Sequence, residues 1–77
     1  MSNYINEVKH IISEKTGLDQ SEVTKDSFFE DDLNIGELEL IEILQELEEI
    51  LQVDLVEEKD NIESVEDLLD ILSEKLD

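Results

Sequence analysis

Acidic side chains are the groups in this sequence whose number and spacing could support chemistry. Aspartate and glutamate together number 24, against five basic residues and one histidine, and the formal net charge is -19. Clustered carboxylates can bind calcium, and a pair of them can act as general acid and base. The chain has no cysteine, which excludes thiolate chemistry and sulfur-ligated metals. His10 has no second histidine with which to form a metal site or a catalytic pair, so we expect a solvated side chain there.

Two acidic segments have part of the spacing of a calcium-binding EF-hand loop. A count from Asp31 places Gly36 at the sixth position and Glu42 at the twelfth, but the third and fifth positions are aliphatic and offer no side-chain oxygen. A count from Asp19 places Ser21 at the third position and Glu30 at the twelfth, but Val23 and Thr24 occupy the fifth and sixth, where the loop needs a side-chain oxygen and a glycine. We therefore expect no dedicated metal site, only weak and non-specific binding of divalent cations to clustered carboxylates.

The residue types argue against an enzyme. Carboxylates on a fully charged surface lack the burial that would raise a pKa for acid–base catalysis. The sequence contains no glycine-rich phosphate loop, no nucleophile elbow and no serine with a credible histidine base. The acidic balance also lacks the cationic footprint that nucleic acids and anionic membranes require. The partner that such a charge favours is a basic patch on another protein.

Length and composition predict one small domain over residues 1–77, which we expect to be monomeric. Hydrophobic residues make up 39% of the chain and recur with helical spacing, which argues against disorder despite the high charge. No signal peptide and no apolar stretch of about 18 residues is present, so a cytoplasmic protein is expected. Self-repulsion of the acidic groups should leave a thin margin of stability that salt or divalent cations increase.

The central predicted element is a helix from Glu37 to Leu51, a stretch with no proline or glycine. At about 100° per residue, six aliphatic residues fall on one core-facing stripe. That stripe comprises Leu40, Ile43, Leu44, Leu47, Ile50 and Leu51. Leu38 and Ile41 project to the other side among acidic residues, which favours a docking surface. The alternative is that Leu38 tucks under the preceding loop.

A first helix is predicted over about Tyr4 to Lys15, with Ser2 or Asn3 as its N-cap and Gly17 as a left-handed C-terminal cap. Five apolar residues share its inward face. They are Tyr4, Ile5, Val8, Ile11 and Ile12.

A last helix is predicted from an N-cap at Ser64 to about Leu76, with Glu66 and Asp67 favourably placed in its first turn. Its inward face comprises Val65, Leu68, Leu69, Leu72 and Leu76. The preceding segment VEEKDN is predicted to form one short helical turn.

The connection between Leu18 and Gly36 is long for a loop without its own structure. Its apolar residues are spaced irregularly, as expected of a loop that crosses a bundle and is pinned at several points. Phe28 and Phe29 are the only phenylalanines, and we expect both to anchor the loop in the core.

Three segments together resemble the acyl carrier protein family over nearly the whole chain. They read IISEKTGLDQSEVTKDSFFEDDL at residues 11–33, LELIEILQELEEIL at 38–51, and VDL followed by IESVEDLLDIL near the C-terminus. The resemblance implies an all-α, four-helix bundle with three main helices, one short helix and a long first loop. It also implies an acidic second helix that docks on basic patches of partner enzymes.

The family carries 4′-phosphopantetheine on a serine in a motif such as L-G-x-D-S-L, and residues 33–38 read LNIGEL here. Asn34 replaces the glycine, Gly36 the aspartate and Glu37 the attachment serine. A carboxylate cannot form the usual phosphodiester, so we predict that no cofactor is attached. Ser27 follows an aspartate but lies ten residues early, and Ser21 and Thr24 have no motif around them. Natural divergence and engineered loss of the serine are both open.

The resemblance implies partner-facing positions on the second helix. They are Leu38, Glu39, Ile41, Glu42, Gln45, Glu48 and Glu49. The leading hypothesis is therefore a non-catalytic domain of fatty-acid, lipid or polyketide metabolism that docks without carrying an arm, either regulating enzymes or serving as a structural subunit. One alternative is a working acyl carrier modified at an unusual hydroxyl, and another is an acidic, cation-binding helical protein. A further alternative is that the glutamates of this helix only keep the protein soluble.

Overall fold

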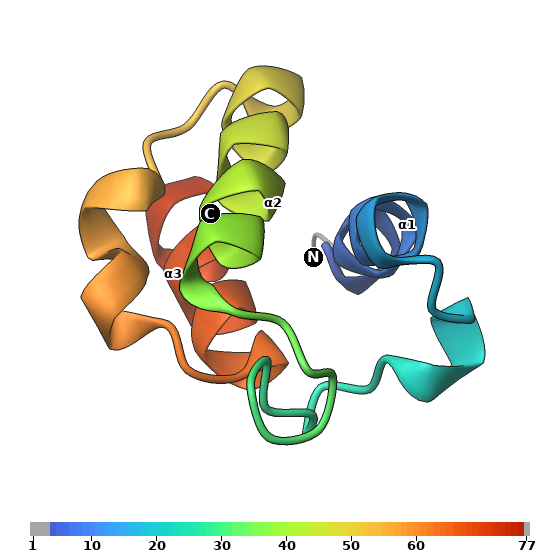
Figure 1. The fold of residues 1–77 in the computed structure, drawn as a ribbon. Coiled ribbons are helices and arrows are strands. Elements are labelled where there is room, and N and C mark those ends of the chain that lie inside the picture. The colour runs from blue at the N-terminus through green and yellow to red at the C-terminus, as the bar shows by residue number, and fades with distance from the viewer. Residues whose placement is uncertain (1–3, 77) are drawn as a thin grey trace.

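Three α-helices and two short 3-10 helices form the fold in the computed structural model, which describes residues 4–76. In chain order the elements are α1 (Ile5–Thr16), η1 (Gln20–Glu22), α2 (Glu37–Leu51), η2 (Val56–Asn61) and α3 (Val65–Leu76). This arrangement confirms the predicted all-α fold with a long first loop and a short helix before the last one. In Figure 1, α2 stands between α1 on one side and η2 with α3 on the other, and the long loop crosses one end of the bundle.

α2 begins and ends at the predicted residues and supplies the centre of the core. Its buried residues are Leu40, Ile43, Leu44 and Leu47. The prediction that Ile50 also faces the core is wrong, because 47% of its surface is exposed. Ile50 lies at the edge of the apolar stripe, whereas Leu51 in the same last turn is partly buried and packs against the core. The exposure of Ile50 therefore follows from its marginal position on the helix.

α1 and α3 contribute most of their predicted inward faces to the same core as α2. The fully buried residues are Val8, Ile11 and Ile12 on α1, with Val65, Leu68 and Leu72 on α3. Tyr4, Leu69 and Leu76 are partly buried and pack against this core. Ile5, also predicted on the inward face, is half-buried. The two helical patterns in the sequence therefore had the correct phase.

The long first loop is pinned to the core at four points, as its irregular apolar spacing predicts. The buried residues are Val23, Phe29, Leu33 and Ile35. Phe28, however, is 46% exposed, so the prediction that it anchors the loop in the core is wrong. Its segment pairs with the start of α3: the Phe29 N–H donates to the Glu63 carbonyl at 3.0 Å, and the Val65 N–H donates to the Ser27 carbonyl at 2.9 Å. Successive side chains in such an extended pairing point to opposite sides, and Phe29 takes the inner one.

The ends of the helices follow local signals. Gly17 has φ of 80°, the left-handed conformation predicted for the C-cap of α1. Ser64 caps α3 as predicted, because its Oγ accepts from the Asp67 N–H at 3.2 Å while the Asp67 carboxylate accepts from the Ser64 N–H at 3.2 Å. α1 begins at Ile5, one residue later than predicted. The proposed caps at residues 2 and 3 lie outside the described residues.

Candidate functional site

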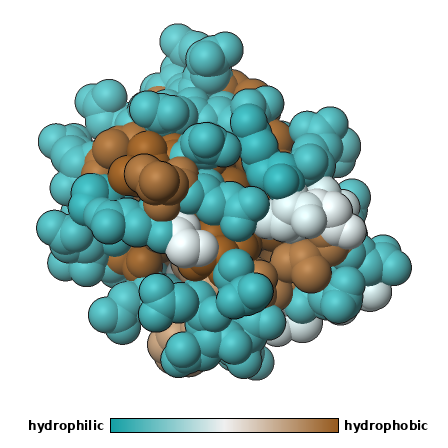
Figure 2. Space-filling view, in the orientation of Figure 1, coloured by the Kyte–Doolittle hydropathy of each residue, from teal (hydrophilic) through white to brown (hydrophobic). Residues whose placement is uncertain are grey.

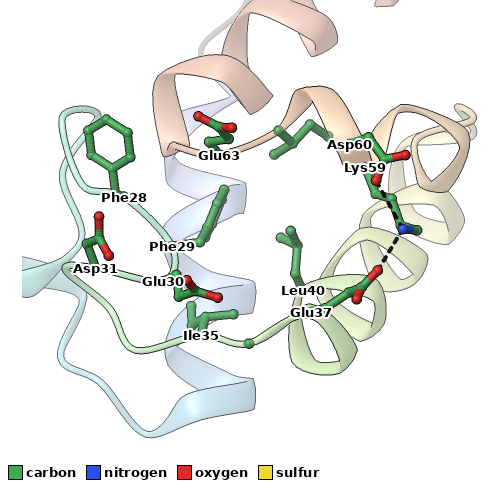
Figure 3. Close-up of a pocket in the computed structure, with 12 residues that line it drawn as sticks. Phe28, Phe29, Glu30, Asp31, Ile35, Glu37, Leu40, Lys59, Asp60 and Glu63 are labelled. Carbon is green, nitrogen blue, oxygen red and sulfur yellow. Dashed lines mark hydrogen bonds and ion pairs between the residues drawn. The ribbon is translucent and has the colours of Figure 1, made fainter.

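The first residue of α2 forms an ion pair beside a surface groove (Figure 3). Glu37 Oε2 lies 2.7 Å from Nζ of Lys59 on η2, and the same Nζ lies 3.2 Å from Oδ1 of Asp60. The hydrogen bond to Glu37, and then the one to Asp60, raise the pKa of Lys59. The ion pair thus joins the start of α2 to η2. Sequence patterns contain no signal for it, since the two partners are 22 positions apart.

The backbone of residues 33–38 is compatible with the attachment motif that these residues resemble. Asn34 has φ of 58°, in the left-handed region that glycine adopts without strain and asparagine tolerates better than most residues. Gly36 has φ of -80° and ψ of 179°, an ordinary extended conformation, and a Cβ added there would meet no atom within 4 Å. The backbone therefore accepts a glycine at position 34 and a Cβ at position 36.

The groove has a volume of about 520 Å³ and lies between the long loop, the start of α2 and η2. Its floor is apolar and is formed by residues that are almost completely buried. They are Phe29, Ile35, Leu40 and Ile62. Phe28 stands at its edge, and in Figure 3 the Phe29 ring and the Leu40 side chain point into the same space. Carboxylates occupy the rim. They belong to Glu30, Asp31, Glu37, Asp60 and Glu63.

The outer face of α2 presents an apolar residue within an acidic surface. Leu38 is 79% exposed, which excludes the alternative that it tucks under the preceding loop. Ile41 is half-buried, while Glu42 and Glu49 are exposed. Gln45 is exposed as well, and Glu39 is half-buried at the core edge. Hydrophilic residues cover most of the molecular face in Figure 2, and hydrophobic residues reach that surface in separate places.

Glu48 has an internal role that sequence reasoning missed. Its Oε2 accepts hydrogen bonds from the Leu55 N–H at 2.7 Å and from the Val56 N–H at 2.9 Å. These two bonds lower the pKa of the Glu48 carboxyl from its ordinary value of 4.5. The carboxylate thereby fixes the turn that leads from α2 into η2. No sequence signal could have identified it, because its partners are backbone groups that every residue except proline carries.

Other candidate groups are placed as follows. Ser27 is buried, and its Oγ accepts from the Thr24 N–H at 3.1 Å, so this hydroxyl is inaccessible to a modifying enzyme in the folded chain. His10 is exposed and lies 3.4 Å from the Glu14 carboxylate.

Within residues 4–76, no group of three or more histidine, aspartate or glutamate side chains is arranged to hold a metal ion. Over the same residues, each helix is too short or too polar to cross a membrane.

Comparison with known proteins relates the fold to a carrier protein. No family model matches the sequence. Among solved structures, the chain is similar to the apo doublet acyl carrier protein from prodigiosin biosynthesis, with a TM-score of 0.81 and 27% sequence identity over 92% of this chain. The match covers 35% of that protein, so this chain spans about a third of its length. The chain therefore has an acyl-carrier-protein fold, and the similarity is to a carrier and not to an enzyme, in agreement with the predicted non-catalytic character.

Proposed function

We propose that this chain is an acyl-carrier-protein-like domain that docks on biosynthetic enzymes through the outer face of α2 and carries no 4′-phosphopantetheine arm. The proposal rests on the resemblance of residues 33–38 to the attachment motif, in which Glu37 takes the place of the serine. The observation that supports it is the pairing of the Glu37 carboxylate with Lys59 at 2.7 Å. The fold supports a carrier-protein-like role in biosynthesis, and the substitution removes the hydroxyl on which carriage depends. Fatty-acid, lipid and polyketide assembly are the candidate settings.

The residues present do not fit the arm. Attachment requires a hydroxyl oxygen that becomes part of a phosphodiester, and the Glu37 side chain ends in a carboxylate. Ser27 follows an aspartate, as the attachment serine of the motif does, but it is buried and hydrogen-bonded to Thr24. The alternative is a working carrier that is modified at another hydroxyl. That hydroxyl would have to be exposed, as Ser21 on η1 is.

The docking mode is supported by the pattern of exposure on α2. Leu38 and Ile41 provide an apolar contact, and Glu42 and Glu49 provide charge around it. Charges at the rim of an interface chiefly set the encounter rate and its salt dependence. Glu48 belongs to the same set of predicted contacts, but its bonds to the η2 backbone give it a separate structural role.

The first test is intact mass after incubation with coenzyme A and a broad-specificity phosphopantetheinyl transferase, beside protein isolated from its native host. A matched control restores the motif by Asn34→Gly, Gly36→Asp and Glu37→Ser, changes that the backbone accommodates. We expect an unmodified parent and a variant that gains the mass of one arm. An arm on the parent would overturn the proposal, and peptide mapping would then identify the hydroxyl that carries it.

The second test is the association rate with an acyl-carrier-protein-dependent enzyme from the same host. Reversing Glu42 and Glu49 to lysine should slow association at low salt by at least about tenfold while leaving the melting temperature nearly unchanged. The control reverses Asp70 and Glu74, two exposed residues of α3, and makes the same change in net charge. Equal rates for the two double variants would refute docking through α2.

A further inference from the structure

Phe28 is an exposed apolar side chain that neither the core nor the docking face of α2 explains, and it lines the groove. It is 46% exposed, and in Figure 3 its ring stands on the loop at one end of the groove, while Phe29 and Leu40 point into the space between the walls. The backbone pairing of this segment with residues 63–65 fixes the side of the loop from which the Phe28 side chain projects. A large exposed aromatic beside an apolar hollow is a feature of sites that take up a partner side chain.

The negative charge of the groove favours a cationic ligand over an anionic one. Five carboxylates and one lysine line it, so the lining carries an excess of four negative charges. Lys59, the one cation among the described residues that line it, is already paired with Glu37 and Asp60. A fatty-acid carboxylate or an anionic headgroup would be repelled by this rim. A second copy of the chain, with its net charge of -19, would be repelled as well.

We propose that this groove is a second docking site, which binds a cationic segment of a partner protein by inserting one aliphatic or aromatic side chain beside Phe28. Lysines or arginines flanking that side chain would pair with Glu30 and Glu63, which lie on opposite sides of the groove in Figure 3. A volume of about 520 Å³ accommodates one large side chain together with part of its backbone. The site lies on the loop side of α2 and is distinct from the face around Leu38.

The test uses two synthetic peptides, acetyl-Lys-Lys-Leu-Lys-Lys-amide and the same peptide with serine in place of leucine. Both peptides carry the same charge, so non-specific attraction to the acidic surface is common to them. Titration into ¹⁵N-labelled protein should show that the leucine peptide binds about tenfold more tightly, because a leucine side chain leaves water. Shift changes specific to leucine should appear at the backbone amides of Phe28, Phe29, Gly36 and Glu63.

A pair of variants with matched exposure sharpens the result. Phe28→Ala removes the groove edge, and Ile50→Ala removes an apolar residue that is 47% exposed at the far end of α2. We expect the preference for leucine over serine to fall at least about threefold in the first variant and to stay unchanged in the second. Both should melt close to the parent.

Two outcomes would overturn the groove as a docking site. One is equal affinity for the leucine and serine peptides in the parent protein. The other is a set of leucine-specific shift changes at Leu38 and Ile41 in place of the groove. That second outcome would leave docking through the outer face of α2 intact, so the two proposals fail separately.

Discussion

Glu48→Ala should destabilise the domain although the residue lies on a helix surface crowded with like charges. The substitution removes the oxygen that accepts from the Leu55 and Val56 N–H groups at 2.7 and 2.9 Å. Leu55 is completely buried, so water cannot readily replace the carboxylate at its N–H group. Hydrogen bonds to charged groups contribute about 1.5–3 kcal/mol each, and the two bonds here share one partly exposed oxygen. We therefore expect a loss of about 2 kcal/mol in the free energy of unfolding.

The neighbouring Glu49 provides the control. Its side chain is exposed, and its backbone carbonyl, not its carboxylate, accepts from the Gln52 side chain at 2.8 Å. Glu49→Ala removes the same charge from the same acidic helix, so it measures the relief of repulsion by itself. We expect Glu49→Ala to lie within about 0.5 kcal/mol of the parent. The difference between the two variants then isolates the bonds to the η2 backbone.

The assay is urea unfolding followed by far-UV circular dichroism, at neutral pH and about 0.15 M salt. A loss of about 2 kcal/mol corresponds to a melting temperature lower by roughly 8–16 °C in a domain of this size. Equal stability of Glu48→Ala and Glu49→Ala would refute the assignment of Glu48 as the residue that fixes this turn.

The pH dependence gives an independent check on the same bonds. Because they stabilise the ionised carboxyl, the pKa of Glu48 is lower in the folded chain than its ordinary value of 4.5. Its contribution to stability is therefore complete above pH 4.5 and is lost as the pH falls through the lower, folded value. The gap between the parent and Glu48→Ala should close at acidic pH. A gap that stays constant as the carboxyl is protonated would contradict this explanation.

Further predictions concern the core and the charge of the whole domain. Leu47→Ala should cost about 2–5 kcal/mol of unfolding free energy because Leu47 is completely buried, whereas Ile50→Ala should cost less than about 1 kcal/mol. Urea unfolding checks both, and a Leu47→Ala variant that melts like the parent would mean that the phase of α2 is wrong. Raising sodium chloride from about 0.01 to 0.15 M should raise the melting temperature, since screening weakens the self-repulsion of a chain with net charge -19. A calorimetric scan that shows a lower melting temperature at the higher salt would contradict this.

The features that the sequence predicted correctly depend on residues close together in the chain. The bounds of α2 follow from an uninterrupted helical pattern, the Gly17 cap from the freedom of glycine at φ of 80°, and the start of α3 from Ser64 and Asp67 three positions apart. The order of these elements, together with the segments that resemble the carrier family, was sufficient to predict the fold. The absence of an arm, the docking residues, the monomeric state and the cytoplasmic location stay predictions.

Tertiary structure decided which apolar residues at the margins are covered. The sequence pattern gives no reason to distinguish Phe28 from Phe29. The pairing of their segment with residues 63–65 turns Phe29 inward and Phe28 outward. Ile50 satisfies the helical pattern of the core stripe, but it lies at the edge of that stripe and is 47% exposed. Periodicity gives the direction of a side chain on its own helix and contains no information on which marginal positions another element covers.

Tertiary structure also decided which of many similar carboxylates have a specific partner. Glu48 and Glu49 are chemically identical and adjacent, yet only Glu48 accepts bonds from the backbone after α2. Glu37 meets Lys59 because the chain turns back between α2 and η2. The sequence by itself determined the three α-helices, the short helix before α3, most inward-facing residues and the acidic surface, since those depend on local residue types; η1 was not predicted. The groove and its paired charges arise only when segments distant in sequence are packed together.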